Sequence, residues 1–161
     1  MSSGPPTDAD AQIEAAKAQG RDVLCFKCWP GKPSAAPGKG KGDCVKNPTE
    51  YAGLAAITPR WRDVFSDMWD GEKVTVWERS FRTHQHALQS AKFTAAGLPE
   101  VAALFSTDGG ELGEGPAHRA RRAANDGNVT ANLTAAQWAM WEAARQRMKA
   151  EIYAAKFREG N

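Results

Sequence analysis

Three polar side chains share one face of a helix predicted over residues 83–95. Gln85, Gln89 and Lys92 follow one another at steps of four and three residues, so they lie on the same side of an α-helix. An adjoining face of the same helix is apolar and carries Leu88, Ala91 and Ala95. A row of amides that ends in a cation, beside a core-facing stripe, is typical of a site for a polar ligand. The alternative is a solvated helix face.

Residues 37–43, with the sequence PGKGKGD, combine glycine with lysine. Glycines allow the backbone to approach a phosphate closely, while Lys39 and Lys41 supply positive charge. The spacing of a Walker loop is absent. The pattern therefore indicates either a phosphate-binding loop of another kind or a flexible surface loop.

Cysteine and histidine residues raise the question of a metal site. Cys25 and Cys28 have the C-x2-C spacing that begins many zinc sites. The second half of such a site is poor, because Cys44 has no cysteine partner at short spacing and His84 and His86 point to different sides of a helix. We therefore predict free thiols, no metal and no cofactor; a zinc-stabilised interaction module is the alternative.

A run of basic residues begins at His118 and includes Arg119, Arg121 and Arg122. Such a run can face a phosphate or a nucleic acid, although a solvated helix face is the simpler interpretation. The sequence contains none of the patterns GxSxG, HExxH and GxGxxG, so the common nucleophile-elbow, zinc-protease and dinucleotide sites are excluded.

The elements that must position these residues are mostly helical. Caps, prolines and apolar spacing predict helices over 8–19, 48–57, 60–69, 83–95, from 99 onward, from 116 to 124, and over 134–157; Thr83 and Thr134 are the expected N-caps of the helices over 83–95 and 134–157. Apolar or alternating segments predict short strands over 23–26 and 74–77, with loops over 30–43 and 109–115. The expected fold is α+β and predominantly α. Residues 1–21 form a tail with a short helix, and residues 22–161 form a single domain with a small β element.

Composition limits the class of protein. The chain has 161 residues, 42% apolar and 25% charged, which is typical of one globular domain. A net charge of +2 is too small for a dedicated DNA-binding domain. The sequence shows neither a signal peptide nor a run of 18 apolar residues. We therefore expect a cytoplasmic protein that does not act in a membrane.

The segment FRTHQHALQSAKF at residues 81–93 resembles the signature of the NADAR (YbiA-like) family, which is approximately W/F-x-S/T-x-E-H-x-x-Q-x-x-K-F. Three further segments agree in order and spacing. PGKGKGD at 37–43 is similar to the glycine-rich segment of the family, WRDVFSDM at 61–68 to its WR-x-x-LSNF segment, and AKF at 155–157 to a later segment. The resemblance covers residues 22–161.

The resemblance implies a YbiA-like fold and an N-glycosidase, a hydrolase acting on ADP-ribosyl or ribosyl-phosphate compounds. Such ligands include riboflavin-pathway-like intermediates and ADP-ribosylated nucleic acid. The matched positions and their surroundings give catalytic candidates Asp43, Asp67, Gln85 and Lys92. They also give ligand-binding candidates Lys39, Lys41, Trp61, Ser66, Trp69, His86 and Gln89. A carboxylate would stabilise the oxocarbenium charge that develops at the ribose.

Two features depart from the family pattern. The glutamate that precedes the histidine in the family is Gln85 here, and an amide carries no charge with which to stabilise a cation. The chain also ends just after AKF, where the family continues with a further helix, so we expect the C-terminal part of the family domain to be absent. The alternative function is therefore a non-catalytic module that binds ADP-ribose or a nucleotide.

Overall fold

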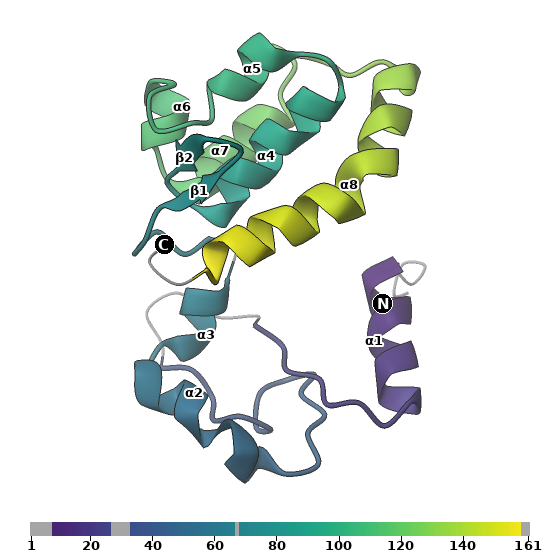
Figure 1. Cartoon of the computed structure of the whole chain (residues 1–161), viewed down its shortest axis with the longest axis vertical. Helices are drawn as coiled ribbons and strands as arrows, with labels where there is room; N and C mark the ends of the chain where they lie inside the picture. The colour runs from purple at the N-terminus through teal and green to yellow at the C-terminus, as the bar shows by residue number, and fades with distance from the viewer. Residues whose placement is uncertain (1–7, 27–32, 67, 159–161) are drawn as a thin grey trace. The chain divides into compact units, whose positions relative to one another are not determined.

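The computed structural model describes residues 8–26, 33–66 and 68–158, and it divides into two compact units (Figure 1). We name Met1–Ser66 the N-terminal unit and Asp67–Asn161 the C-terminal unit. The boundary between the units falls inside the domain predicted over residues 22–161. Each unit is described by itself.

The N-terminal unit contains short helices joined by long loops. The elements are α1 (Asp8–Ala18), the 3-10 helix η1 (Pro48–Tyr51), α2 (Ala52–Ile57) and α3 (Trp61–Phe65). Helix α3 is shorter than predicted because Ser66 has an extended backbone with ψ 149°. An aromatic cluster packs within this unit: the rings of Phe26 and Phe65 stack at 5.0 Å, and Trp61 meets both edge-on.

The strand predicted over residues 23–26 is wrong. Val23 and Cys44 form a single antiparallel bridge instead. Pairing does not extend along the partner segment, which is preceded by the turn-forming residues 37–43 and followed by Pro48. Proline and glycine at both ends therefore confine the ladder to one bridge.

The C-terminal unit is built around one helix. Strands β1 (Val74–Val76) and β2 (Arg79–Phe81) form an antiparallel hairpin in which Val74 pairs with Phe81. The helices that follow are α4 (His84–Ala95), α5 (Pro99–Ala103), α6 (Glu111–Glu114), α7 (Ala117–Ala124) and α8 (Ala135–Lys156). Helix α4 contacts α5, α7, α8 and the hairpin. The short helix α6 lies inside the segment that we predicted to be a loop.

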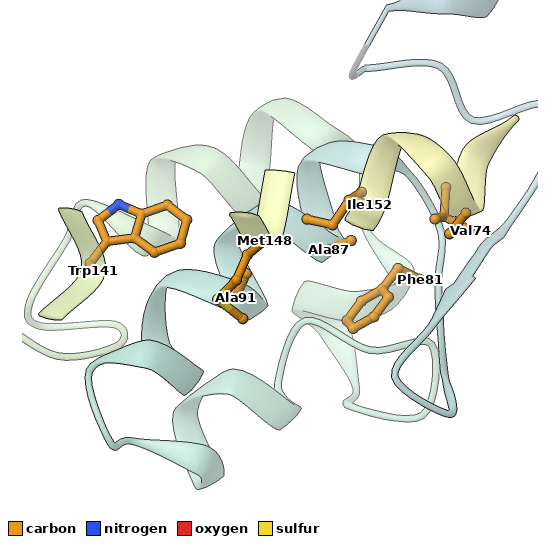
Figure 2. Packing of buried hydrophobic residues seen from close by; sticks show 8 residues of the cluster. Val74, Phe81, Ala87, Ala91, Trp141, Met148 and Ile152 are labelled. Atoms are coloured by element: carbon orange, nitrogen blue, oxygen red, sulfur yellow. The ribbon is translucent and has the colours of Figure 1, made fainter. Parts of the chain in front are cut away.

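Two clusters of buried side chains hold the C-terminal unit together. The first joins α4, α8 and the hairpin, and Figure 2 shows Phe81, Ala87 and Ile152 at its centre. The second lies on another side of α4, where the rings of Phe93 and Phe105 stack at 5.7 Å. Helix α4 is therefore packed on several sides, which is unusual for a helix with so many polar residues.

Side-chain caps fix the starts of the two longest helices of the C-terminal unit, as predicted. The Thr83 hydroxyl accepts the backbone N–H of His86 at the start of α4. Thr134 and Gln137 form a reciprocal capping box at the start of α8. Such caps typically contribute about 1 kcal/mol each. They define the register of α4 and with it the positions of the polar side chains.

The predicted fold class, α+β and predominantly α with a small β element, is confirmed. Among the described residues, no helix has both the length and the apolar character needed to cross a bilayer.

The hairpin turn gives a prediction about stability. Trp77 and Glu78 have φ angles of 52° and 60°, a left-handed conformation that is costly for residues with a Cβ atom. Replacing Glu78 with glycine should stabilise the protein by about 1 kcal/mol, measured by urea unfolding. The matched control is Glu72→Gly, an exposed position outside the left-handed region, which should give no gain. An equal response of both variants would contradict this account of the turn.

Candidate functional site

The polar face of α4 is buried. We call Gln85, Gln89 and Lys92 the amide face; their exposed fractions are 3%, 8% and 6%. The alternative of a solvated helix face is therefore wrong. Contacts made by Lys92 place the C-terminal end of this face beside the last residue of α7 and the first turn of α8.

Gln85 and Gln89 differ from His86, Ser90 and Lys92, the buried polar residues of α4 whose side chains form hydrogen bonds. Neither side chain makes a hydrogen bond to any residue in the described part of the chain. Their amide atoms are not among the fully buried atoms without a partner, so they retain some access to solvent. The two residues are one helical turn apart, so their amides are neighbours on the helix surface.

Lys92 has a structural contact that the sequence did not reveal. Its ammonium donates a hydrogen bond of 2.9 Å to the carbonyl of Ala124 at the end of α7. The rings of Phe93 and Trp138 lie 5.1 and 5.0 Å from the same nitrogen. Burial lowers the pKa of Lys92. The ammonium thus caps the C-terminus of a neighbouring helix, and its predicted catalytic role stays a prediction.

His86 is fully enclosed and uses both ring nitrogens. Nδ1 lies 2.8 Å from the Thr83 hydroxyl, and Nε2 lies 3.0 Å from the carbonyl of Leu112 in α6. Because a carbonyl can only accept, Nε2 carries the proton and Nδ1 accepts from the hydroxyl. Burial lowers the pKa of His86, so the ring is neutral near pH 7. Its contacts join α6 to the start of α4, and the predicted ligand-binding role stays a prediction.

His84 is a functional candidate that sequence reasoning missed. The residue is 1% exposed, and both ring nitrogens lack a hydrogen-bond partner among the described residues. The ring packs against Tyr153 of α8 with centroids 4.3 Å apart. Burial, together with the charges of Lys156 and Lys149, lowers the pKa of His84 to about 4. The signal in the sequence is that His84 begins the apolar stripe that continues through Leu88 and Ala91.

Asp43 organises the glycine-rich loop. Its carboxylate accepts the backbone N–H groups of Cys25, Gly38 and Gly40 at 2.9–3.0 Å. It also binds the Arg62 guanidinium through two nitrogens, at 2.6 and 3.1 Å. Neither side chain of this pair is more than 3% exposed. The loop is therefore ordered rather than flexible, contrary to the second alternative for residues 37–43.

These contacts lower the pKa of the Asp43 carboxyl group. Burial acts to raise the pKa of the carboxyl, but hydrogen bonds from Arg62, Cys25 and Gly40 outweigh it, and the net pKa is lowered. Arg62 also donates to the carbonyls of Cys25, Ala35 and Ala36. The carboxylate is thus occupied by structural donors, and the catalytic role predicted for it has no support in this geometry.

The remaining predicted ligand-binding residues have mixed surroundings. Lys39 and Lys41 are exposed, whereas Ser66 and Trp69 are half-buried. Trp61 is 1% exposed, and the Arg62 guanidinium carbon lies 4.3 Å from its ring centroid. Because its ring is enclosed, Trp61 does not present a free face for stacking on a base. Asp67 lies outside the described residues.

Sequence reasoning also missed Asp63 of α3. Its side chain is 6% exposed and forms an ion pair with Arg60. The indole nitrogen of Trp61 in the same helix lacks a hydrogen-bond acceptor within the described ranges. The five-residue helix is too short to show a periodic pattern, so the sequence carries no signal for this burial.

The cysteines show no sign of a metal site, and the basic run is exposed, among the residues that the structure describes. Cys25 is half-buried, Cys44 is exposed and both are free, while Cys28 lies outside the described residues. No group of three or more potential metal ligands occurs among the residues that the structure describes. The basic run forms α7, and its four cationic or imidazole side chains are exposed, as the simpler interpretation predicted.

The predicted site residues belong to two units. Asp43, the two loop lysines, Trp61 and Ser66 lie in the N-terminal unit, whereas the amide face, His86 and Trp69 lie in the C-terminal unit. The structure brings Gln85, Gln89 and Lys92 together on one side of α4, as their spacing predicted. Comparison with protein-family models, with curated proteins and with solved structures yields no match for this chain.

Proposed function

We propose that this chain is a NADAR-like recognition module that binds the ribosyl part of an ADP-ribosyl or ribosyl-phosphate ligand without hydrolysing it. The observation that carries the proposal is the pair of buried amides, Gln85 and Gln89, which have no hydrogen-bond partner in the described part of the chain. Neither amide is among the fully buried atoms that lack a partner, so both keep some contact with solvent, and a polar ligand can replace that water.

The chemistry of an amide pair suits a ribose. Each glutamine offers an acceptor oxygen and two N–H donors. A vicinal diol offers two hydroxyl groups that both donate and accept. Two amides one turn apart can therefore bind adjacent hydroxyls, and the resemblance of residues 81–93 to the family signature supports the same ligand class.

Recognition rather than hydrolysis follows from the charges available. Cleavage of an N-glycosidic bond needs a carboxylate near the developing oxocarbenium ion. Gln85 stands where the family has glutamate and is uncharged. The Asp43 carboxylate is occupied by Arg62 and three backbone N–H groups. The Lys92 ammonium is held by Ala124.

Calorimetry with the full chain tests the proposal. ADP-ribose should bind saturably to the unmodified protein. Gln85→Leu and Gln89→Leu should each raise the dissociation constant about tenfold, which corresponds to the loss of one hydrogen bond. The matched control is Gln146→Leu, an exposed glutamine of α8, which should bind like the unmodified protein. Absence of saturable binding, or equal effects of all three substitutions, would overturn the proposal.

A parallel assay separates recognition from catalysis. The unmodified protein and Gln85→Glu are incubated with an N-linked ADP-ribosyl nucleoside, and release of the base is followed chromatographically. We expect no release by the unmodified protein. Release by the unmodified protein would show that it is an N-glycosidase and would contradict the proposed recognition function. Release gained by Gln85→Glu alone would show that this position lies at the reacting carbon.

A further inference from the structure

The C-terminal unit contains a pocket whose lining includes no residue of the amide face. Its volume is about 580 Å³, and its walls come from the end of α5, α6, α7 and the segment after α7. This volume lies within the range of roughly 300–1,000 Å³ that is usual for small-molecule sites.

Part of the lining of this pocket is apolar and open to water. Leu104 and Val129 line it and are 36% and 50% exposed. Leu112 and Ala123 lie beside them in the same lining. Exposed aliphatic side chains gathered in one hollow favour a ligand with an apolar body, since covering them contributes about 25 cal/mol per Å².

Another part of the lining is basic. His118, Arg119 and Arg122 line the pocket, which agrees with their spacing on one side of α7, whereas Arg121 is outside the lining. Arg119 forms a loose ion pair with Glu111, 3.4 Å apart. Arg122 makes no ion pair with any described residue. Its planar guanidinium is therefore free to bind two oxygens of an anion.

The acidic residues of the lining do not neutralise Arg122. The Glu111 carboxylate is paired with the Arg119 guanidinium. Asp126 also lines the pocket, and its carboxylate accepts the backbone N–H of Asn128 at 3.0 Å. Arg122 is thus the guanidinium of the lining that an anionic head group can reach without displacing an acidic side chain.

We propose that this pocket binds a small organic anion with an apolar body and a carboxylate or phosphate head. The body lies against Leu104, Leu112 and Val129. The oxyanion binds the guanidinium of Arg122, with Arg119 beside it. This inference does not depend on the proposed function, since the two sites have no residue in common.

Binding of three naphthalene probes to the full chain tests the pocket. 1-Naphthyl phosphate and 1-naphthoate carry the two head groups, and 1-naphthalenemethanol is the neutral control. At least one anion should bind saturably and about tenfold more tightly than the alcohol, consistent with a charge-assisted hydrogen bond. The tighter anion identifies the head group.

Two matched variants locate the binding. Arg122→Gln should weaken binding of the anion about tenfold. Arg121→Gln makes the same change on the same helix, at an exposed residue outside the lining, and should have no effect. Circular dichroism checks that both variants are folded. Equal losses in both variants, equal affinity for the alcohol, or no saturable binding of either anion would each overturn the proposal.

Discussion

Replacing Arg62 with methionine is expected to destabilise the N-terminal unit by about 3–5 kcal/mol, because it leaves the buried Asp43 carboxylate without its counter-ion. The Asp43 side chain has no exposed surface, and that of Arg62 is 3% exposed. The same guanidinium also donates hydrogen bonds to the carbonyl oxygens of Ala35 and Ala36. One substitution thus removes the charge partner and two loop contacts together.

Hydrogen exchange in the full chain measures this effect locally. The backbone N–H groups of Cys25, Gly38 and Gly40 all donate to Asp43. In Arg62→Met they should exchange at least about a hundredfold faster, which corresponds to a loss of about 3 kcal/mol. The control is Arg21→Met, at an exposed arginine, which should leave these amides protected. Unchanged exchange in Arg62→Met would show that the ion pair does not hold the loop.

Replacing His84 with phenylalanine is expected to remove a large part of the acid sensitivity of the protein. The pKa of His84 is lowered from 6.5 to about 4 by burial and by Lys156 and Lys149. Between these pH values the unfolded chain binds a proton that the folded chain does not. The contribution of His84 to stability is therefore complete above pH 6.5 and falls as the pH drops toward 4, by roughly 3 kcal/mol in all.

Urea unfolding from pH 7 to pH 4 compares the two proteins. The introduced phenyl ring would keep the contact with Tyr153 but would not titrate, so His84→Phe should gain stability relative to the unmodified protein as the pH falls. His86 is present in both proteins, so its contribution cancels when their free energies of unfolding are subtracted. The control is His118→Gln, an exposed histidine, whose curve should follow that of the unmodified protein. Parallel curves for His84→Phe would contradict the pKa assigned to His84.

The parts of the fold that local residues determine were predictable from the sequence. Thr83 and Thr134 cap α4 and α8 as expected, since a cap depends on contacts within four residues. Val74–Val76 forms a strand because its alternation places Val74 in the core. The spacing of Gln85, Gln89 and Lys92 correctly placed them on one side of α4, because helical periodicity needs no tertiary information.

The parts that distant residues determine were not predictable. Asp43 binds Arg62 across 19 positions, and no local pattern links an acidic residue in a glycine loop to that arginine. Lys92 binds Ala124 across 32 positions, so its burial depends on where α7 ends. The strand over residues 23–26 failed for the same reason, since a strand exists only where a partner segment allows pairing.

Three polar residues of α4 hold neighbouring helices in place through hydrogen bonds. His86 holds the carbonyl of Leu112 in α6, Ser90 that of Ala102 in α5, and Lys92 that of Ala124 in α7. Folding alone would therefore preserve these residues even in a protein that had lost all chemistry. The side chains of Gln85 and Gln89 form no hydrogen bond to another described helix. If diverging copies of this chain retain both glutamines, their retention would therefore indicate selection for ligand binding, separately from selection for the fold.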